Sequence, residues 1–333
     1  MSKKSLLALV MMVAFVAISA NAYGWANPDL LMNPDDVEKI AAKPDWVILD
    51  CRGKEAYGKE HIPGAIVLDC RKDLRDGTER VSKPAQLEKI LGGAGISNDK
   101  HVVVYGDAKD IVHASVGFWI LEYMGHDKTH FLDGGLTEWK AAGKPVTTEP
   151  KTLPQATFKA NVVPSRYAST EEILKIAKGE TKGVQVIDAR TEKEYNGKES
   201  RSLRGGRIPN TTINVSHDIT YDKRTGKLLP EKFLEGKFYG ALDKNKRTIG
   251  LCQTGSRSTL TYLQLRLLGF KDPTNYDDSW IVYGNSVYPP YPVENEQWIN
   301  MEGLVKMPAD IKKLKKEIED LRKELKLPPK ENK

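Results

Sequence analysis

The sequence predicts an α/β protein with two similar domains, each a parallel sheet flanked by helices, followed by an amphipathic C-terminal helix. Short apolar runs typical of strands alternate with helical patterns. The same order of motifs occurs twice, because Arg52 and Tyr57 are matched by Arg190 and Tyr195 further along the chain. With 333 residues, the chain has room for both domains.

The first domain is expected over residues 34–146. Asn33 followed by Pro34 and two aspartates predicts a helix that ends near residue 42. Further strands are expected at 46–49, 66–68, 101–105 and 129–132, and further helices at 53–59, 83–91, 116–124 and 136–142. Because strands alternate with helices, the strands should lie parallel in one sheet.

The second domain is expected over residues 167–300. Its residues 184–190 repeat the strand and Asp-x-Arg pattern of residues 46–52, and Ile208-Pro209 repeats Ile62-Pro63. The offset between the copies stays between 138 and 146 residues, as these pairs show. A constant order at a nearly constant offset indicates a duplicated domain.

Three segments lie outside the two domains. Residues 1–22 combine early lysines, a short apolar run and an Ala-x-Ala site, so we expect a cleaved signal peptide and export to the periplasm. An uncleaved anchor is the alternative, although the run is shorter than the about 20 residues that span a membrane. Residues 147–166 contain three prolines and predict an extended surface linker.

The C-terminal tail, residues 301–333, has apolar residues three and four apart between Ile311 and Leu325. This spacing predicts an amphipathic helix over residues 308–327. The helix could pack against its own domain or mediate association with a second copy or a partner, and the spacing does not separate these alternatives.

The overall composition excludes several classes of protein. The net charge of +6 is mild and sits largely at the chain ends, so we expect no nucleic-acid partner. The six histidines lack the spacing of metal ligands, so we expect no metal and no organic cofactor. Cys51 and Cys70 each follow a strand in an Asp-Cys-Arg context and could form a disulfide or remain two free thiols.

The third cysteine, Cys252, has the clearest chemical context. It ends an apolar strand and is followed by a tight loop, Arg257 and a helical pattern. Such a loop aims successive backbone N–H groups at one point, while Arg257 and the helix N-terminus favour the thiolate. The thiolate could then take a sulfur atom as a persulfide. The expected cradle for the developing charge on sulfur consists of Gln253, Thr254, Gly255, Ser256, Arg257 and Ser258.

The pattern Cys-x-x-Gly-x-Arg-Ser resembles the active loop of the rhodanese sulfurtransferases. The Asp-x-Arg pair, the Ile-Pro turn and the segment Tyr276–Trp280 extend this resemblance to the two-domain rhodaneses over about residues 34–298. The resemblance implies an active site in the second domain that faces an inactive first domain. A Cys phosphatase is the less favoured alternative, because its loop needs one more residue between Cys252 and Arg257.

Other polar residues near these motifs are candidates with two interpretations. Arg190 is expected to face a bound anion with Asp188 in support, or else the two form a structural salt bridge. Asp107 and Asp110 stand where the first copy lacks a cysteine, and we expect solvated loop acids.

The resemblance implies transfer of sulfur from a small anionic donor to cyanide, a small thiol or a protein thiol. In the family, thiosulfate enzymes tend to carry basic residues just after the cysteine and an Arg where Glu194 stands here. These departures favour 3-mercaptopyruvate, whereas a basic cluster of Arg201, Arg204 and Arg207 favours thiosulfate. We expect thiosulfate, with 3-mercaptopyruvate or a persulfide carrier for a redox partner as alternatives.

Overall fold

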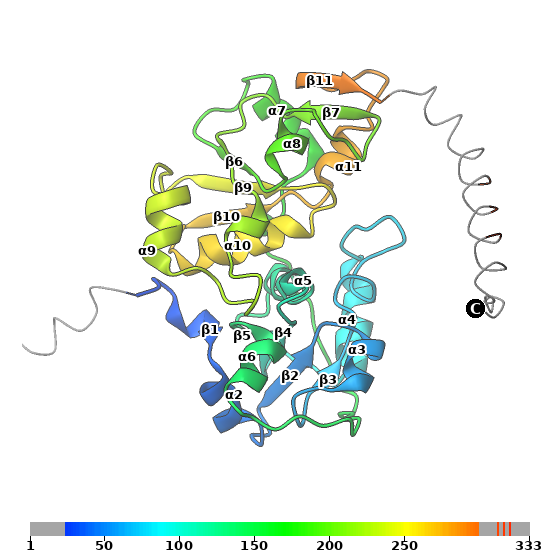
Figure 1. The fold of residues 1–333 in the computed structure, drawn as a ribbon, viewed down its shortest axis with the longest axis vertical. Coiled ribbons are helices and arrows are strands. Elements are labelled where there is room, and N and C mark those ends of the chain that lie inside the picture. Colours follow the sequence, from blue (N-terminus) through cyan, green and yellow to red (C-terminus); the bar gives the residue numbers. More distant parts are fainter. Residues whose placement is uncertain (1–23, 300–311, 313–315, 317–319, 321–333) are drawn as a thin grey trace, which may run out of the picture.

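The computed structural model describes residues 24–299 together with Lys312, Lys316 and Asp320 (Figure 1). The expected signal peptide and nearly all of the expected C-terminal helix lie outside the described residues. Within the described part of the chain, no helix has the length and apolar character needed to cross a membrane. The two predicted α/β domains are confirmed, and Figure 1 shows them as two lobes along the long axis.

The first domain is built on five parallel strands in the order β1-β5-β4-β2-β3. The strands are β1 (Leu31–Met32), β2 (Trp46–Asp50), β3 (Ile66–Val67), β4 (His101–Tyr105) and β5 (Thr129–Leu132). The helices are η1 (Pro28–Leu30), α2 (Pro34–Ile40), α3 (Lys54–Lys59), α4 (Pro84–Gly93), α5 (Ile111–Tyr123) and α6 (Gly135–Ala141). Because alternate strand residues face opposite sides, α4 and α5 cover one face and α2, α3 and α6 cover the other.

The second domain has four parallel strands in the order β10-β9-β6-β8, with a separate antiparallel pair of β7 and β11. The strands are β6 (Gln185–Asp188), β7 (Arg204–Arg207), β8 (Ile213–Asn214), β9 (Arg247–Leu251), β10 (Asp272–Asn275) and β11 (Glu294–Trp298). The helical segments are η2 (Pro164–Arg166), α7 (Thr170–Ala177), α8 (Glu192–Tyr195), η3 (His217–Ile219), α9 (Glu231–Leu234), η4 (Glu235–Tyr239), α10 (Arg257–Leu267) and α11 (Ser279–Tyr283). Helices α7 and α11 pack on one face of the sheet, and α9 and α10 pack on the other.

Three elements differ from the sequence-based expectation. Helix α5 begins at Ile111 instead of residue 116, because the Asp110 side chain caps it by accepting a hydrogen bond from the Val112 N–H. Strand β1 lies before the expected start of the first domain at residue 34, and it pairs with β5 over only two residues. Residues 147–163 have no helix or strand, as expected for a linker, but they pack against the first domain through Phe158, which is 4% exposed.

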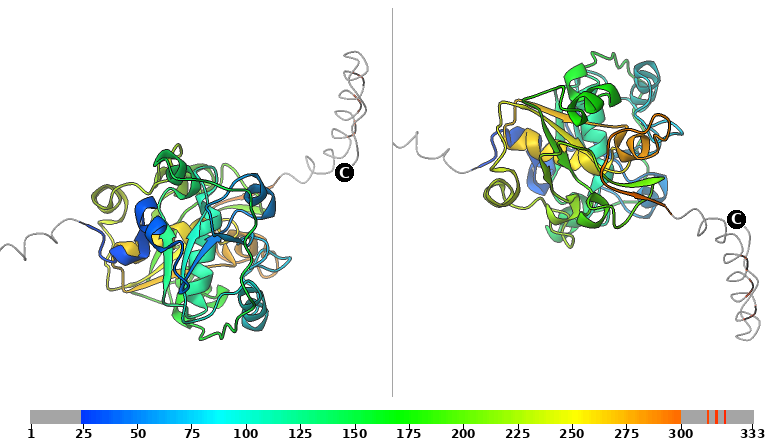
Figure 2. Two further views of the ribbon diagram at one scale, coloured as in Figure 1. Left: turned by 90° about the horizontal axis from the view of Figure 1, so that it is seen from below. Right: turned by 90° about the horizontal axis from the view of Figure 1, so that it is seen from above.

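The domains meet where α5 packs against α10, and Figure 1 shows these helices between the two sheets. Figure 2 looks along the long axis, so that the two domains overlap in its views. One continuous core contains Phe118 of α5 together with Leu260, Leu263 and Leu267 of α10. In the same interface the buried Ser115 and Thr259 hydroxyls are hydrogen bonded at 2.8 Å. The second domain therefore holds its Cys252-bearing loop directly against the first domain.

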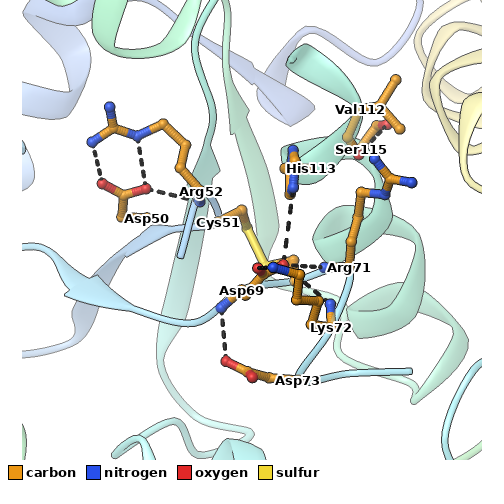
Figure 3. The surroundings of a disulfide bond; sticks show 11 residues. Asp50, Cys51, Arg52, Asp69, Arg71, Lys72, Asp73, Val112, His113 and Ser115 are labelled. Atoms are coloured by element: carbon orange, nitrogen blue, oxygen red, sulfur yellow. Dashed lines mark hydrogen bonds and ion pairs between the residues drawn. A yellow bond between two sulfur atoms is a disulfide. The ribbon is translucent and has the colours of Figure 1, made fainter. Parts of the chain in front are cut away.

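The structure resolves the open question of Cys51 and Cys70 in favour of a disulfide, with Cα atoms 4.9 Å apart. Figure 3 shows the bridge between the Asp50–Arg52 pair and a polar cluster around Asp69. Both cysteines are wholly buried beneath α5. A Cβ atom on Gly117 would lie 2.8 Å from each sulfur, so the helix can pass this closely only as glycine.

Candidate active site

The loop from Cys252 to Ser258, here called the Cys252 loop, connects β9 to the first turn of α10. Gly255 has a φ of +73°, and a Cβ there would lie 2.5 Å from the Asp277 carbonyl oxygen. The Asn275 side chain donates to the Gly255 carbonyl at 3.1 Å, and the Cys252 N–H donates to the Ser279 hydroxyl at 3.0 Å. The segment after β10 therefore fixes the shape of the loop, and only glycine fits at its tightest point.

The electrostatics of the loop favour a thiolate at Cys252. Burial raises the pKa of Cys252, but the Arg257 charge and the backbone N–H groups of Ser258 and Thr254 outweigh it, so that the pKa lies below its usual value. The two amides that lower this pKa come from near the start and from the end of the loop.

A cavity of about 280 Å³ lies over the Cys252 loop at the domain interface. The loop contributes Gln253, Thr254, Ser256 and Arg257; the first domain contributes Arg71, Lys109, Asp110 and Val112; the rest of the second domain contributes Arg201, His217 and Tyr221. We call this cavity the loop pocket. It mixes residues from both domains, as the resemblance implied.

The position of the thiol differs from the sequence-based expectation. Cys252 is wholly buried and lies beneath the loop pocket instead of lining it. Gln253, Thr254, Ser256 and Arg257 line the pocket above it. A sulfur donor must therefore reach the thiol past these residues.

Glu194 is central to the charge pattern of the site. Its carboxylate oxygens accept from the two terminal nitrogens of Arg257 at 2.8 and 3.0 Å, and one oxygen also accepts from Arg201 at 2.8 Å. Burial raises the pKa of Glu194, but the two arginines outweigh it and hold the pKa well below its usual value. Thr191 and Glu194 also form a capping box at the start of α8, which explains why this carboxylate is held so rigidly.

The Asp188–Arg190 pair is placed apart from the loop pocket. The Arg190 guanidinium binds both Asp188 oxygens, with the shortest distance 2.6 Å, and lies 4.1 Å from the centre of the Trp280 ring. It also donates to the Gly206 carbonyl and is 1% exposed. These contacts form the structural salt bridge, which is the alternative that the sequence left open for this pair.

Of the other basic candidates, one lines the loop pocket and two form ion pairs elsewhere. Arg201 lines the loop pocket, but Arg204 donates to Glu296 and Arg207 donates to Glu294, each at 2.9 Å. Both of these arginines therefore hold β11 against β7. Tyr276 and Trp280 are wholly buried in the core of the second domain.

Several pocket residues come from the first domain, and sequence reasoning did not single them out. Arg71 and Lys109 add two positive charges to the pocket wall. Asp110 is more than a solvated acid, because it caps α5, lines the pocket and lies 2.7 Å from His113. Asp107 lies 3.7 Å from Arg52. Arg71 lies directly after Cys70, and this position was the one available sequence signal.

His217 is a further pocket residue that the sequence did not identify. Its Nδ1 atom is buried and has no hydrogen-bond partner. Burial and the Arg257 charge lower the pKa of His217 to about 4, so the imidazole is neutral at pH 7. Within the described residues, no group of three or more His, Cys, Asp or Glu side chains is arranged to hold a metal ion.

A lowered-pKa cysteine in an amide-lined loop, on the second of two parallel-sheet domains, defines a class of cysteine-dependent group-transfer proteins. The rhodanese-like domain family matches residues 33–142 and 170–285. The chain belongs to the rhodanese family and is a rhodanese-type sulfurtransferase.

Named relatives cover most of the chain. A Mycobacterium bovis protein named "Putative thiosulfate sulfurtransferase 1" is 32% identical over 80% of this chain and 98% of its own length. The sulfur carrier protein TtuD of Thermus thermophilus is 30% identical over 79% of this chain and 96% of its own length. The fold is also similar to the anaerobic ergothioneine biosynthesis enzyme of Chlorobium limicola, with a TM-score of 0.72 and 20% identity over 81% of this chain and 71% of that chain.

Proposed function

We propose that this protein transfers the outer sulfur of thiosulfate to a nucleophilic acceptor through a persulfide on Cys252. The observation that carries the proposal is a cysteine of lowered pKa beneath a pocket that is rich in cations. Thiolate character makes the sulfur nucleophilic, and the cations attract an anionic donor.

The balance of charge favours a dianion as the donor. Arg71, Lys109, Arg201 and Arg257 line the pocket, and the opposing carboxylates are Asp110 and Glu194. Four positive charges against two negative charges leave a net charge that matches thiosulfate. The carboxylate of 3-mercaptopyruvate would neutralise only half of it.

The proposed reaction has two steps. The Cys252 thiolate attacks the outer sulfur of thiosulfate, the sulfur–sulfur bond breaks, and sulfite leaves with the bonding electrons. The anionic persulfide remains, with its charge facing the loop amides of Thr254 and Ser258. Cyanide or a thiolate then attacks the outer sulfur, which releases thiocyanate or the acceptor persulfide and restores the Cys252 thiolate.

The test is mass spectrometry of the protein after incubation with each donor. We expect thiosulfate to add one sulfur atom to the Cys252 peptide, and we expect no gain in Cys252→Ser. Loading from 3-mercaptopyruvate alone would replace thiosulfate as the donor. Loading from neither small molecule, in a protein that titrates normally, would contradict the proposed reaction.

A persulfide carrier is the second candidate, because one relative of similar coverage is named a sulfur carrier protein. Multiple turnover with thiosulfate and cyanide distinguishes the two functions. An enzyme cycles many times without a partner, whereas a carrier loads once and then holds its sulfur until an acceptor protein arrives.

A further inference from the structure

A segment of the first domain reaches across the interface and contacts the Cys252 loop. Its central residue, Arg75, is 5% exposed and donates to three groups of the second domain. One terminal nitrogen binds the Thr254 carbonyl at 2.7 Å and the Asp277 carboxylate at 2.6 Å, and the other binds the Ser256 hydroxyl. Arg75 does not line the loop pocket, although its partners Thr254 and Ser256 do. Together with Arg71, it lines a neighbouring cavity.

The three partners of Arg75 surround Gly255, where the backbone of the loop turns most tightly. Thr254 and Ser256 flank Gly255, whose positive φ and close approach to Asp277 define the turn. Because the peptide bond is planar and trans, the Thr254 carbonyl and the Gly255 N–H point in opposite directions. Holding the carbonyl toward Arg75 therefore holds that N–H away from Arg75. Ser256 in turn precedes the α10 N-terminus, from which the Ser258 N–H faces the sulfur.

We propose that Arg75 is a positioning residue for sulfur transfer, which acts from the domain without a catalytic cysteine and keeps the loop amides aimed at Cys252. The consequence for catalysis rests on the proposed function. The first domain then contributes more than a pocket wall, because it determines the geometry of the thiolate site in the second domain.

The role of Arg75 is geometric more than electrostatic. The buried Asp277 carboxylate pairs with Arg75 and also accepts from the Val81 N–H at 2.7 Å. The charge of Arg75 is thus balanced locally and adds little potential at the sulfur. What a replacement would lose is the planar fork that reaches Thr254, Ser256 and Asp277 at once.

The variant that tests the proposal is Arg75→Lys. It keeps a cation beside Asp277, but it cannot reproduce the planar fork of the guanidinium. The control is Arg80→Lys, because Arg80 lies on the same segment and donates across the interface to Asp278 at 3.1 Å without a contact to the loop. The first readout is the ultraviolet titration of the Cys252 thiolate, which is isolated because Cys51 and Cys70 are joined in a disulfide. The second is the single-turnover rate of sulfur loading from thiosulfate.

We expect Arg75→Lys to raise the Cys252 pKa and to slow loading by on the order of 10²-fold, the effect of a misplaced catalytic geometry, with a much smaller change in the thiosulfate KM. Arg80→Lys should leave both readouts within about 3-fold of the wild type. If Arg75→Lys titrates and loads like the wild type, the proposal is wrong.

If Arg75→Lys fails to fold, the double variant Arg75→Met/Asp277→Asn removes both buried charges together and should show the same raised Cys252 pKa. A wild-type titration in the folded double variant would overturn the proposal. If the wild type itself takes no sulfur, the proposed function fails, but the titration shift still decides whether Arg75 positions the loop.

Discussion

Glu194 binds Arg257 through both carboxylate oxygens, and this pair joins the start of α8 to the start of α10 beside the buried thiol. Arg257 therefore presents to the pocket a charge that is partly balanced. Arg201 shares the same carboxylate. Glu194 partly neutralises both Arg257 and Arg201, so it should set how strongly the pocket binds an anionic donor.

We expect Glu194→Gln to lower the thiosulfate KM, because it removes one negative charge from the pocket, and to lower kcat because Arg257 loses its orientation. Breaking a buried pair should also cost about 3–5 kcal/mol of the unfolding free energy. The kcat/KM split and urea unfolding measure both effects. A raised KM with unchanged kcat would show that Glu194 does not oppose donor binding.

The Glu194 carboxylate also predicts an acid-sensitive stability. Because its pKa is lowered in the folded state from 4.5, its contribution is present above that value and declines as the pH falls below it. Unfolding free energies measured from pH 7 to pH 3 should therefore fall less steeply below pH 4.5 in Glu194→Gln than in the wild type. Parallel curves would contradict the lowered pKa.

His217 should act in a different pH window. Its folded pKa of about 4 lies below the ordinary value of 6.5, so the unfolded chain binds a proton first as the pH falls. Its contribution is fully present above pH 6.5 and is lost between 6.5 and 4, by about 2–3 kcal/mol. His217→Gln should flatten the stability curve in that window, which chemical unfolding at each pH would measure.

Lys109 offers a test of the donor, because no carboxylate pairs with it among the residues that the structure describes. We expect Lys109→Met to raise the KM for thiosulfate by about tenfold, corresponding to roughly 1.4 kcal/mol, and to affect a monoanionic donor less. Lys140→Met is the control, since Lys140 pairs with Glu60 outside the loop pocket. If Lys109→Met raises the KM equally for a dianionic and a monoanionic donor, the charge of the pocket is not what makes the protein prefer thiosulfate.

The Cys51–Cys70 disulfide tethers the segment that carries Arg71 and Arg75. We expect Cys51→Ala/Cys70→Ala to lose roughly 3 kcal/mol of unfolding free energy, as a loop of this length predicts, and to raise the KM for thiosulfate because Arg71 is less well placed. Thermal unfolding and steady-state kinetics measure these. If the variant is less stable but its kinetics are unchanged, the disulfide contributes to stability only and does not help to place Arg71.

The duplicated α/β fold and the Cys252 loop could be predicted because their signals are local or repeat at a constant offset. The burial of Cys252 could not, since it depends on how the loop packs in the folded protein. The contacts of Arg75 and Glu194 could not be predicted for a related reason. Their partners lie far away in sequence, and only tertiary packing brings them together. Arg204 and Arg207 are expected near the donor from the sequence alone, because the β7–β11 pairing that occupies them leaves no local signal.

Gly255 provides the most direct test of the loop geometry. We expect Gly255→Ala to slow sulfur loading by about 10²-fold or more, because the new Cβ would lie 2.5 Å from the Asp277 carbonyl oxygen at a φ that disfavours side chains. The loop would have to shift, and the amides of Thr254 and Ser258 would no longer face Cys252 together. Single-turnover loading and the Cys252 titration should change in parallel.

Gly58→Ala is the matched control, because a Cβ at Gly58 meets nothing within 4 Å and lies in the first-domain helix α3. It should load sulfur at the wild-type rate and be slightly stabilised, since alanine is the better helix former. If Gly255→Ala loads as fast as Gly58→Ala while both remain folded, the amides around Cys252 are not what makes its sulfur reactive, and the persulfide proposal loses its physical basis.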